Sequence, residues 1–434
     1  MNRKRFWAAL FVFSLIGQIA WVVENMYFNV FIYHMFNASP AEISLMVQAS
    51  AVAATLTTLF IGALSDRLGK RKAFITVGYI LWGISILCFA ALRIDWIEKL
   101  FPNAAKSAVN AASIGVTLVI VFDCIMTFFG STANDACFNA WLTDSTDDSN
   151  RGKAEGVNAM MPLVAILVVF GGTMWAKKDN AAHWTILFLI IGGIVLLSGV
   201  LGFFLIDDSK HPDPNPDGYF KTLFFGFRPG IIRRNPDLYL SLICFTIFGI
   251  SIQVFMPYLI LYYTEALHLD NYVLIMAPAI VLAAVATAFY GRLYDRIGYR
   301  KSLIPALLVL LAGYVFLYAC RHTALVFIGS LLMMCGYLCG MAVFGARIRD
   351  CTPLGLAGRF QGLRIIGQVL IPGVVGPEIS KLVLRGAETV INDDGTSSFI
   401  PNADIYLWAG IALLPIAIVI AAEIIRGRKV QKNA

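Results

Sequence analysis

Charge is scarce in this sequence. Asp, Glu, Lys and Arg make up 14% of the 434 residues, whereas a soluble domain carries about 25%. Hydrophobic residues account for 59%, and the mean hydropathy is +0.74. These values exclude an ordinary soluble domain, because so much apolar surface needs lipid as its solvent. The net charge of +7 does not indicate a nucleic-acid-binding protein, since the basic residues sit in short clusters between apolar runs.

Motifs for metal binding, disulfide frameworks and catalysis are also missing. The eight cysteines include no CxxC pair and no cluster with histidine, so we predict neither a zinc site nor a disulfide scaffold. No HExxH, GxSxG or P-loop sequence occurs, which argues against an enzyme. We expect no metal, no cofactor and no nucleic-acid partner.

Long apolar runs dominate the chain instead. A membrane-spanning helix needs about 20 mostly apolar residues. The first run begins like a secretory signal peptide, but it continues past Glu24 with no cleavage-like site, so we interpret it as a membrane helix. The twelve predicted spans are 6–36, 41–64, 73–93, 111–141, 154–176, 183–206, 237–264, 271–291, 302–320, 324–346, 360–385 and 403–425.

One segment divides these spans into two sets of six. Residues 207–236 are rich in proline and charge, so they cannot cross a membrane. The sequence therefore predicts an N-terminal six-helix bundle over 1–206, a cytosolic linker over 207–236 and a C-terminal six-helix bundle over 237–434. With the N-terminus placed inside, 26 of the 34 Lys and Arg residues fall in inside segments and 8 in outside loops. This bias predicts that both termini lie in the cytoplasm. Because the chain lacks long extracellular domains, we expect a multi-pass protein of the cytoplasmic membrane. We expect it to be a monomer.

A short charged motif occurs twice, 229 residues apart. Residues 62–72 read GALSDRLGKRK, and residues 291–301 read GRLYDRIGYRK. Each copy lies between the second and third predicted helices of its half, as a parallel internal repeat requires. A second matching pair, TDSTDDSNRGKAEG from 143 and RDCTPLGLAGRFQG from 349, follows the fourth helix of each half. The sequence therefore predicts two related halves.

These paired loops resemble the signature loop of the major facilitator superfamily. The resemblance covers the whole chain and implies an all-α membrane protein with twelve transmembrane helices in two pseudo-symmetric six-helix bundles. It also implies that each loop is a conformational latch that controls the rocking of the halves. A role in membrane topology alone is the alternative, but it leaves the matched Asp and Gly residues unexplained. The predicted latch residues are Gly62, Asp66, Arg67, Gly69, Arg71, Gly291, Asp295, Arg296, Gly298 and Arg300.

Polar residues form stripes on the first, fourth and eleventh predicted helices when they are plotted at about 100° per residue. Ionisable groups within a span cost about 2.5–3.5 kcal/mol, so the stripes predict a polar cavity that binds the solute. Hydrogen bonds between helices are an alternative for Asn, Gln and Thr, and a place in the aromatic belt is an alternative for Trp and Tyr. The predicted solute-binding residues are Trp21, Glu24, Asn25, Asp123, Asn134, Tyr258, Arg364, Gln368 and Glu378.

Two passages resemble a narrower branch, the glycoside–pentoside–hexuronide:cation symporters. They are NDACFNAWLTDSTDDSNRGKAEG from 134 and DCTPLGLAGRFQGLRIIGQVLIPGVVGP from 350. The branch implies that the helix-4 carboxylate, Asp135 here, serves the cation and sugar sites. Its members carry two carboxylates in helix 2, whereas this chain has none between Glu42 and Asp66. Glu24 is the candidate to replace the missing charge, and a lone buried carboxylate suits a proton better than sodium.

The sequence thus predicts a secondary active transporter that moves a small polar solute, a sugar or glycoside, by alternating access. Asp135 and Glu24 are the predicted coupling residues, and the coupling ion is a proton or a sodium ion. A proton-coupled exporter of amphipathic compounds is the main alternative, and a non-transporting receptor or scaffold is another. The lipid bilayer and the solute are the expected partners.

Overall fold

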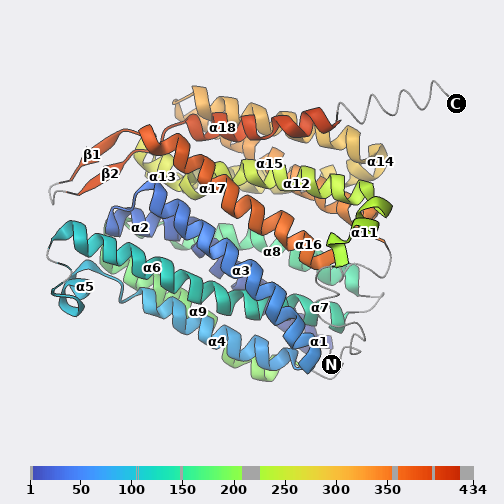
Figure 1. The fold of residues 1–434 in the computed structure, drawn as a ribbon, viewed down its shortest axis with the longest axis horizontal. Coiled ribbons are helices and arrows are strands. Elements are labelled where there is room, and N and C mark those ends of the chain that lie inside the picture. Colours follow the sequence, from blue (N-terminus) through green and yellow to red (C-terminus); the bar gives the residue numbers. More distant parts are fainter. Residues whose placement is uncertain are drawn as a thin grey trace. The chain divides into compact units, whose positions relative to one another are not determined.

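The computed structural model describes residues 3–103, 105, 107–146, 150–207, 225–353, 360–392 and 396–420. The described chain is almost entirely helical (Figure 1) and groups into two units. Unit 1 contains Met1–Tyr219 and Thr389–Phe399, and unit 2 contains Phe220–Glu388 and Ile400–Ala434. The chain therefore passes from one unit to the other within the predicted linker. The segment Thr389–Phe399 groups with unit 1, whereas the sequence analysis places all of 237–434 in the second bundle.

Unit 1 is built from six long helical stretches, of which the first and fourth contain a π-helical segment. Its helices are α1 (Arg3–Val22), η1 (Val23–Tyr27), α2 (Phe28–Phe36), α3 (Pro40–Leu68), α4 (Arg71–Phe89), α5 (Ile94–Leu100), α6 (Ala108–Gly130), η2 (Ser131–Phe138), α7 (Asn139–Ser145), α8 (Arg151–Gly172) and α9 (Ala181–Leu205). Local sequence fixes both ends of α3. Ser39 and Glu42 form a reciprocal capping box at its start, and Gly69 ends it in the left-handed conformation.

Unit 2 repeats this plan with a different pattern of interruptions. Its helices are η3 (Phe225–Phe227), α11 (Pro229–Arg234), α12 (Pro236–Phe255), η4 (Met256–Tyr258), α13 (Leu259–Leu261), η5 (Tyr262–Ala266), α14 (Val273–Ala319), α15 (Thr323–Cys351), α16 (Gln361–Ile365), η7 (Ile366–Leu370), α17 (Ile371–Val383), η8 (Leu384–Gly386) and α18 (Asp404–Ala412). A hairpin of β1 (Thr389–Ile391) and β2 (Ser397–Phe399) lies between η8 and α18 in the chain (Figure 1).

The described helices account for the predicted spans. Ten of them are long and apolar enough to cross a membrane. One of these, α14, has 47 residues and is too long for a single crossing, and it breaks at Gly298, where φ is 77° and ψ is 174°. It therefore contains two predicted spans. A shorter apolar helix over Asp404–Ile420 corresponds to the last one, whose predicted end lies outside the described residues. The prediction of an all-α membrane fold is confirmed.

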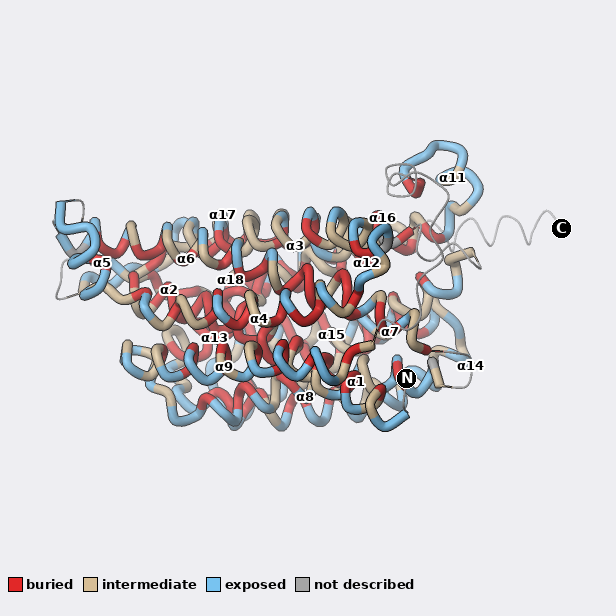
Figure 2. The backbone as a smooth tube through the Cα atoms, turned by 90° about the horizontal axis from the view of Figure 1, so that it is seen from below, coloured by how far each residue is buried: buried red, intermediate tan, exposed pale blue. Residues whose placement is uncertain are grey.

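Small residues let helices within each unit approach closely. A Cβ atom added at Gly83 of α4 would lie 2.5 Å from the Leu196 nitrogen of α9, and one added at Gly199 would lie 2.6 Å from the Ile80 nitrogen. Such contacts replace the hydrophobic driving force that helices lack in lipid. Buried and exposed residues alternate along most helices (Figure 2), which leaves apolar side chains on the outer faces for lipid.

Candidate functional site

Glu24 lies at the centre of a buried polar cluster in unit 1. It belongs to η1 in the first helical stretch and is 6% exposed. Its Oε1 accepts hydrogen bonds from the Ser50 hydroxyl of α3 at 2.6 Å and from the Thr127 hydroxyl of α6 at 2.8 Å. The two hydroxyl oxygens lie 2.9 Å from each other. Three helical stretches therefore meet at one carboxyl oxygen and fix its position.

A second carboxyl group lies beside this cluster. Asp123 is one turn before Thr127 on α6, is 2% exposed and is close enough to Glu24 for electrostatic repulsion. Among the described residues, Glu24 Oε2 and Asp123 Oδ1 have no hydrogen-bond partner. No basic side chain in the described parts of the chain forms an ion pair with either group. Two unpaired buried carboxylates would be costly, so this geometry favours neutralisation of at least one by a bound proton or cation.

Asp135, the other predicted coupling residue, is also in unit 1. It lies in the π-helical segment η2, is half-buried and accepts a hydrogen bond from the Ser131 hydroxyl at 3.0 Å. It is within electrostatic range of Glu24. The Trp21 indole N–H lies near its carboxyl group but outside hydrogen-bond geometry. No group of three His, Cys, Asp or Glu side chains suited to a metal ion occurs in the described part of the chain.

The two predicted asparagines of unit 1 make contacts within the protein. The buried Asn134 amide donates to the Tyr79 hydroxyl at 2.6 Å and to the Phe13 carbonyl at 3.3 Å. These bonds join three helical stretches. They agree with the alternative interpretation of such residues, in which Asn forms hydrogen bonds between helices. The Asn25 amide is exposed and donates to the Trp21 carbonyl one turn earlier, at 2.8 Å. Of the two, Asn25 has the side chain placed to meet a solute.

Several predicted site residues lie in π-helical segments. Glu24 is in η1, Asp135 is in η2 and Gln368 is in η7. A π-helix closes its hydrogen bonds over one more residue than an α-helix, and such segments are frequent at functional sites. The extra residue changes the angular position of every later residue around the helix axis. The rotation of about 100° per residue, which was used to predict the polar stripes, therefore does not hold along these helices. The structure is needed to tell which residues share a face.

The predicted residues of unit 2 are spread along two of its helical stretches. Tyr258 lies in η4 and is fully buried. Arg364 and Gln368 are half-buried, and the Arg364 Nε atom has no hydrogen-bond partner among the described residues. Glu378 is partly exposed and forms an ion pair with Lys381 at 2.5 Å, one turn further along α17. Arg364 and Gln368 are thus one turn apart, and Glu378 is separate from them.

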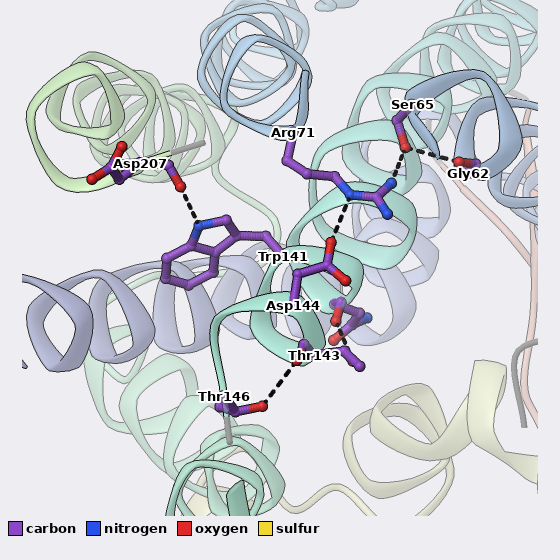
Figure 3. A network of polar contacts seen from close by, with 9 residues as sticks. Gly62, Ser65, Arg71, Trp141, Thr143, Asp144, Thr146 and Asp207 are labelled. Carbon is purple, nitrogen blue, oxygen red and sulfur yellow. Dashed lines mark hydrogen bonds and ion pairs between the residues drawn. The ribbon is translucent and has the colours of Figure 1, made fainter. Parts of the chain in front are cut away.

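The first copy of the repeated loop is a compact polar network (Figure 3). The Arg71 guanidinium donates to the Ser65 hydroxyl at 2.5 Å and to the Asp144 carboxylate at 3.3 Å, and it is buried. Ser65 in turn donates to the Gly62 carbonyl at 2.8 Å. Gly69 has φ 62°, which explains the glycine at this position. The network joins the ends of α3, α4 and α7, and the sequence motif did not show that Ser65 and Asp144 belong to it.

The second copy differs in its partners. Gly298 has positive φ, as its counterpart does, and Asp295 is exposed. The Tyr294 hydroxyl donates to the carboxylate of Asp350, the repeat equivalent of Asp144, at 2.5 Å. The Arg347 guanidinium lies 5.0 Å from the centre of the Tyr299 ring. The two copies thus hold equivalent aspartates with different donors. Four other predicted latch residues are exposed: Arg67, Gly291, Arg296 and Arg300. The side chain of Asp66 lies outside the described residues.

Sequence reasoning missed the hydroxyl groups that bond to the carboxyl groups of Glu24 and Asp135. Ser50 and Ser131 are not among the predicted site residues, although both bond to a predicted coupling residue. A single serine in an apolar helix is a weak signal, because it often bonds only to its own backbone. Thr127 is four residues after Asp123, and that helical spacing was the one available indication of its place.

The chain is similar to known membrane transporters. Residues 6–377 match the profile of the Major Facilitator Superfamily. An uncharacterized MFS-type transporter of Bacillus subtilis, YybF, is 23% identical over 65% of this chain and 63% of its own length. Sugar efflux transporter B of Salmonella typhimurium is 21% identical over 71% of each chain. The chain thus matches somewhat less than two thirds of the length of the first of these relatives.

Solved structures resemble the fold over nearly all of the chain. The nucleoside transporter NupG has a TM-score of 0.68 and 12% sequence identity, and the match covers 97% of this chain and 99% of NupG. The xylose transporter XylE from E. coli has a TM-score of 0.65 and 15% identity, with 95% and 98% covered. At these identities the likeness shows the fold alone. Together with the profile match over most of the chain, it establishes that this multi-pass membrane protein belongs to the Major Facilitator Superfamily.

Proposed function

We propose that the protein is a secondary active transporter that moves a sugar or glycoside by alternating access, coupled to a proton. Family membership supports transport itself. The names of two similar proteins, a sugar efflux transporter and a xylose transporter, support a sugar-like solute. The name of NupG adds nucleosides, which contain a sugar ring, to the solutes worth testing. We also propose that the protein lies in the cytoplasmic membrane, and the Lys and Arg distribution supports an orientation with both termini in the cytoplasm.

The ring of three oxygen atoms at Glu24 is the observation that supports proton coupling. Glu24 Oε1, Ser50 Oγ and Thr127 Oγ1 are separated by 2.6, 2.8 and 2.9 Å. Three such contacts need three hydrogen atoms, and the two hydroxyl groups supply two. When both hydroxyl groups donate to an ionised Glu24 Oε1, no hydrogen is left for the contact between Ser50 and Thr127. A proton on Oε1 that is donated to one hydroxyl lets that hydroxyl donate to the other, so that each oxygen then donates once and accepts once. The ring is then complete, and the carboxyl group is neutral within the membrane.

A metal cation fits the same three atoms less well. Oxygen ligands at about 2.4 Å from one ion, set at right angles around it, are about 3.4 Å from each other. The oxygens around Glu24 are all closer together than that. The absence of carboxylates in the second predicted helix points the same way. We therefore assign the coupling role to a proton and expect no sodium dependence.

We place the solute beside this site, at Trp21, Asn25 and Asp135. An indole ring offers a flat apolar face for a sugar ring, and a carboxylate and an amide can bond its hydroxyl groups. The half-buried state of Trp21 and Asp135 and the exposure of Asn25 are compatible with access for a ligand. Protonation of Glu24 then removes charge close to the bound solute, which lowers the cost of enclosing it.

Export is the second candidate, because one of the similar proteins is named a sugar efflux transporter. In that case the proton bound at Glu24 crosses the membrane in the direction opposite to the solute. The direction of solute transport is measured with the protein in membranes of known orientation.

The test uses the purified protein in liposomes. Counterflow of labelled monosaccharides, glycosides and nucleosides identifies the solute without any ion gradient. Accumulation is then measured with a pH gradient or a sodium gradient, in vesicles of known orientation. We expect counterflow of one class of sugar and accumulation with the pH gradient only. Counterflow of amphipathic cations and of no sugar or nucleoside would support the exporter of amphipathic compounds, and sodium-driven accumulation would contradict the proton assignment.

A further inference from the structure

Two indole rings meet beside the proposed solute site, both within unit 1. Trp21 of α1 and Trp82 of α4 have ring centroids 5.0 Å apart and planes at 46°. Trp21 is half-buried, whereas Trp82 is fully buried. Trp82 therefore cannot touch a solute, but it forms one wall of the space that holds the Trp21 ring.

The backbone of Gly130 lies against both rings. Gly130 ends α6, and a Cβ atom added to it would lie 2.7 Å from Trp82 Cε2 and 3.0 Å from Trp21 Cη2. Its φ of −61° and ψ of −50° are ordinary helical values that any residue adopts. In a helix interior, glycine is less favourable than alanine. The backbone conformation therefore gives no reason for glycine at this position, whereas the space needed by two indole rings does.

A hydrogen-bonded tyrosine also packs on Trp82. Tyr79 lies one turn earlier on α4 and meets Trp82 edge to face, with centroids 5.4 Å apart and planes at 64°. The Tyr79 hydroxyl donates to the Phe13 carbonyl at 2.8 Å and accepts from the Asn134 amide at 2.6 Å. Tyr79 is itself fully buried. Trp82 is thus held by Tyr79 and by the backbone of α6, so its ring has little freedom to turn.

We propose that Gly130 and Trp82 are positioning residues that set the plane of the Trp21 ring and thereby the affinity for the solute. The inference rests on the proposed function, in which a sugar ring packs on the face of Trp21. Such a contact needs the flat face of the indole to lie along the solute ring. A tilt of Trp21 therefore weakens binding even when every group that touches the solute is unchanged.

A purely structural role for Gly130 makes a different prediction. Glycine lets membrane helices approach closely, and Gly130 could serve only to bring α4 near α6. Its substitution would then lower the thermal unfolding midpoint and leave the affinity for the solute unchanged. Measurements of affinity and stability on the same variants separate the two roles.

The first test is counterflow in liposomes at increasing solute concentration, with full-length wild type and Gly130→Ala. We expect the half-saturating concentration to rise about threefold to tenfold, the size of one aromatic contact. Accumulation under a pH gradient of one unit should stay about tenfold, because Glu24 is unaltered. The matched control is Gly193→Ala in α9, where an added Cβ has no atom within 4 Å, and it should behave as wild type. An unchanged half-saturating concentration in Gly130→Ala would overturn the proposal.

A double variant tests whether Gly130 acts through Trp82. Trp82→Phe removes ring volume and should by itself raise the half-saturating concentration, which keeps the proposal testable if Gly130→Ala does not fold. In the combined variant the smaller ring leaves space for the new Cβ. We therefore expect the combined variant to bind the solute more tightly than Gly130→Ala alone, a strongly non-additive result. Simple addition of the two losses would refute the positioning role of Trp82.

A second measurement needs no solute. Two indole rings this close together couple electronically and give paired bands of opposite sign in far-ultraviolet circular dichroism. The paired bands should be lost in Trp21→Phe and in Trp82→Phe, changed in Gly130→Ala, and kept in Trp175→Phe, which removes another of the eight tryptophans. Unchanged bands in Gly130→Ala would contradict the proposal. Absence of counterflow for every sugar and nucleoside in the wild type would instead refute the proposed function, whatever the bands show.

Discussion

Glu24→Gln removes the proposed proton site and leaves the shape of the side chain almost unchanged. The glutamine oxygen can still accept from Ser50 and Thr127, which now do so at 2.6 and 2.8 Å. Replacing the carboxyl group also ends its repulsion with Asp123. Since an ordinary hydrogen bond contributes about 0.5–1.5 kcal/mol and both are kept, we expect the free energy of unfolding to change by less than about 1 kcal/mol. The thermal unfolding midpoint should therefore stay close to that of the wild type.

The effect on coupled transport should be large. A pH gradient of one unit supplies about 1.4 kcal/mol per proton, which is a factor of ten in concentration. Wild-type protein with one coupled proton should therefore accumulate solute about tenfold under such a gradient. Glu24→Gln cannot release the proton, so accumulation should fall to the level of equilibration. Counterflow, which needs no proton release, should persist.

The assay is uptake and counterflow of the same labelled solute in liposomes, with a matched variant as control. Glu98→Gln makes the same substitution at an exposed glutamate of α5 and should behave as wild type in both measurements. If Glu24→Gln still accumulates solute tenfold, the three-oxygen ring is not the coupling site. If it loses counterflow as well while remaining folded, Glu24 holds the solute and the proton resides elsewhere.

Three further predictions concern the latch loop and the helix contacts. Arg71→Gln should lower the free energy of unfolding by about 1–3 kcal/mol, because the Arg71 guanidinium is buried and bonded to Asp144. Arg67→Gln, at an exposed position, is the control and should leave stability unchanged. Equal thermal unfolding midpoints for the two variants would contradict this prediction. Gly69→Ala should cost about 1–2 kcal/mol from its positive φ and slow counterflow, and an unaffected midpoint would remove the argument. Asn134→Leu should lower the midpoint by losing two hydrogen bonds, but a changed solute preference would instead place that side chain in the binding site.

Some features of the site were within reach of sequence reasoning, and others were not. Glu24 and Asp135 were predicted because a carboxylate within an apolar run is rare and costly. The pairing of Glu24 with Asp123 was not predicted as a unit, because the residues lie on different helices. The π-helical segments also escaped prediction, since they change the rotation of a helix without a clear sequence mark. The β-hairpin escaped for a similar reason: its strands are three residues long and carry no strong alternation.

The sequence by itself determined the spans, the repeat and the family. Lipid demands long apolar helices with satisfied backbone groups, so the hydrophobic pattern is legible without any contacts, and the glycine and charge motif marks both halves. Only the tertiary structure decided which oxygen atoms meet at Glu24, that Asn134 joins helices, and that Phe399 and Thr396 bond to Tyr33 and Asn37. Those outcomes depend on helix packing and on local changes of helical rotation, which involve residues far apart in the chain and leave little trace in the pattern of any single segment.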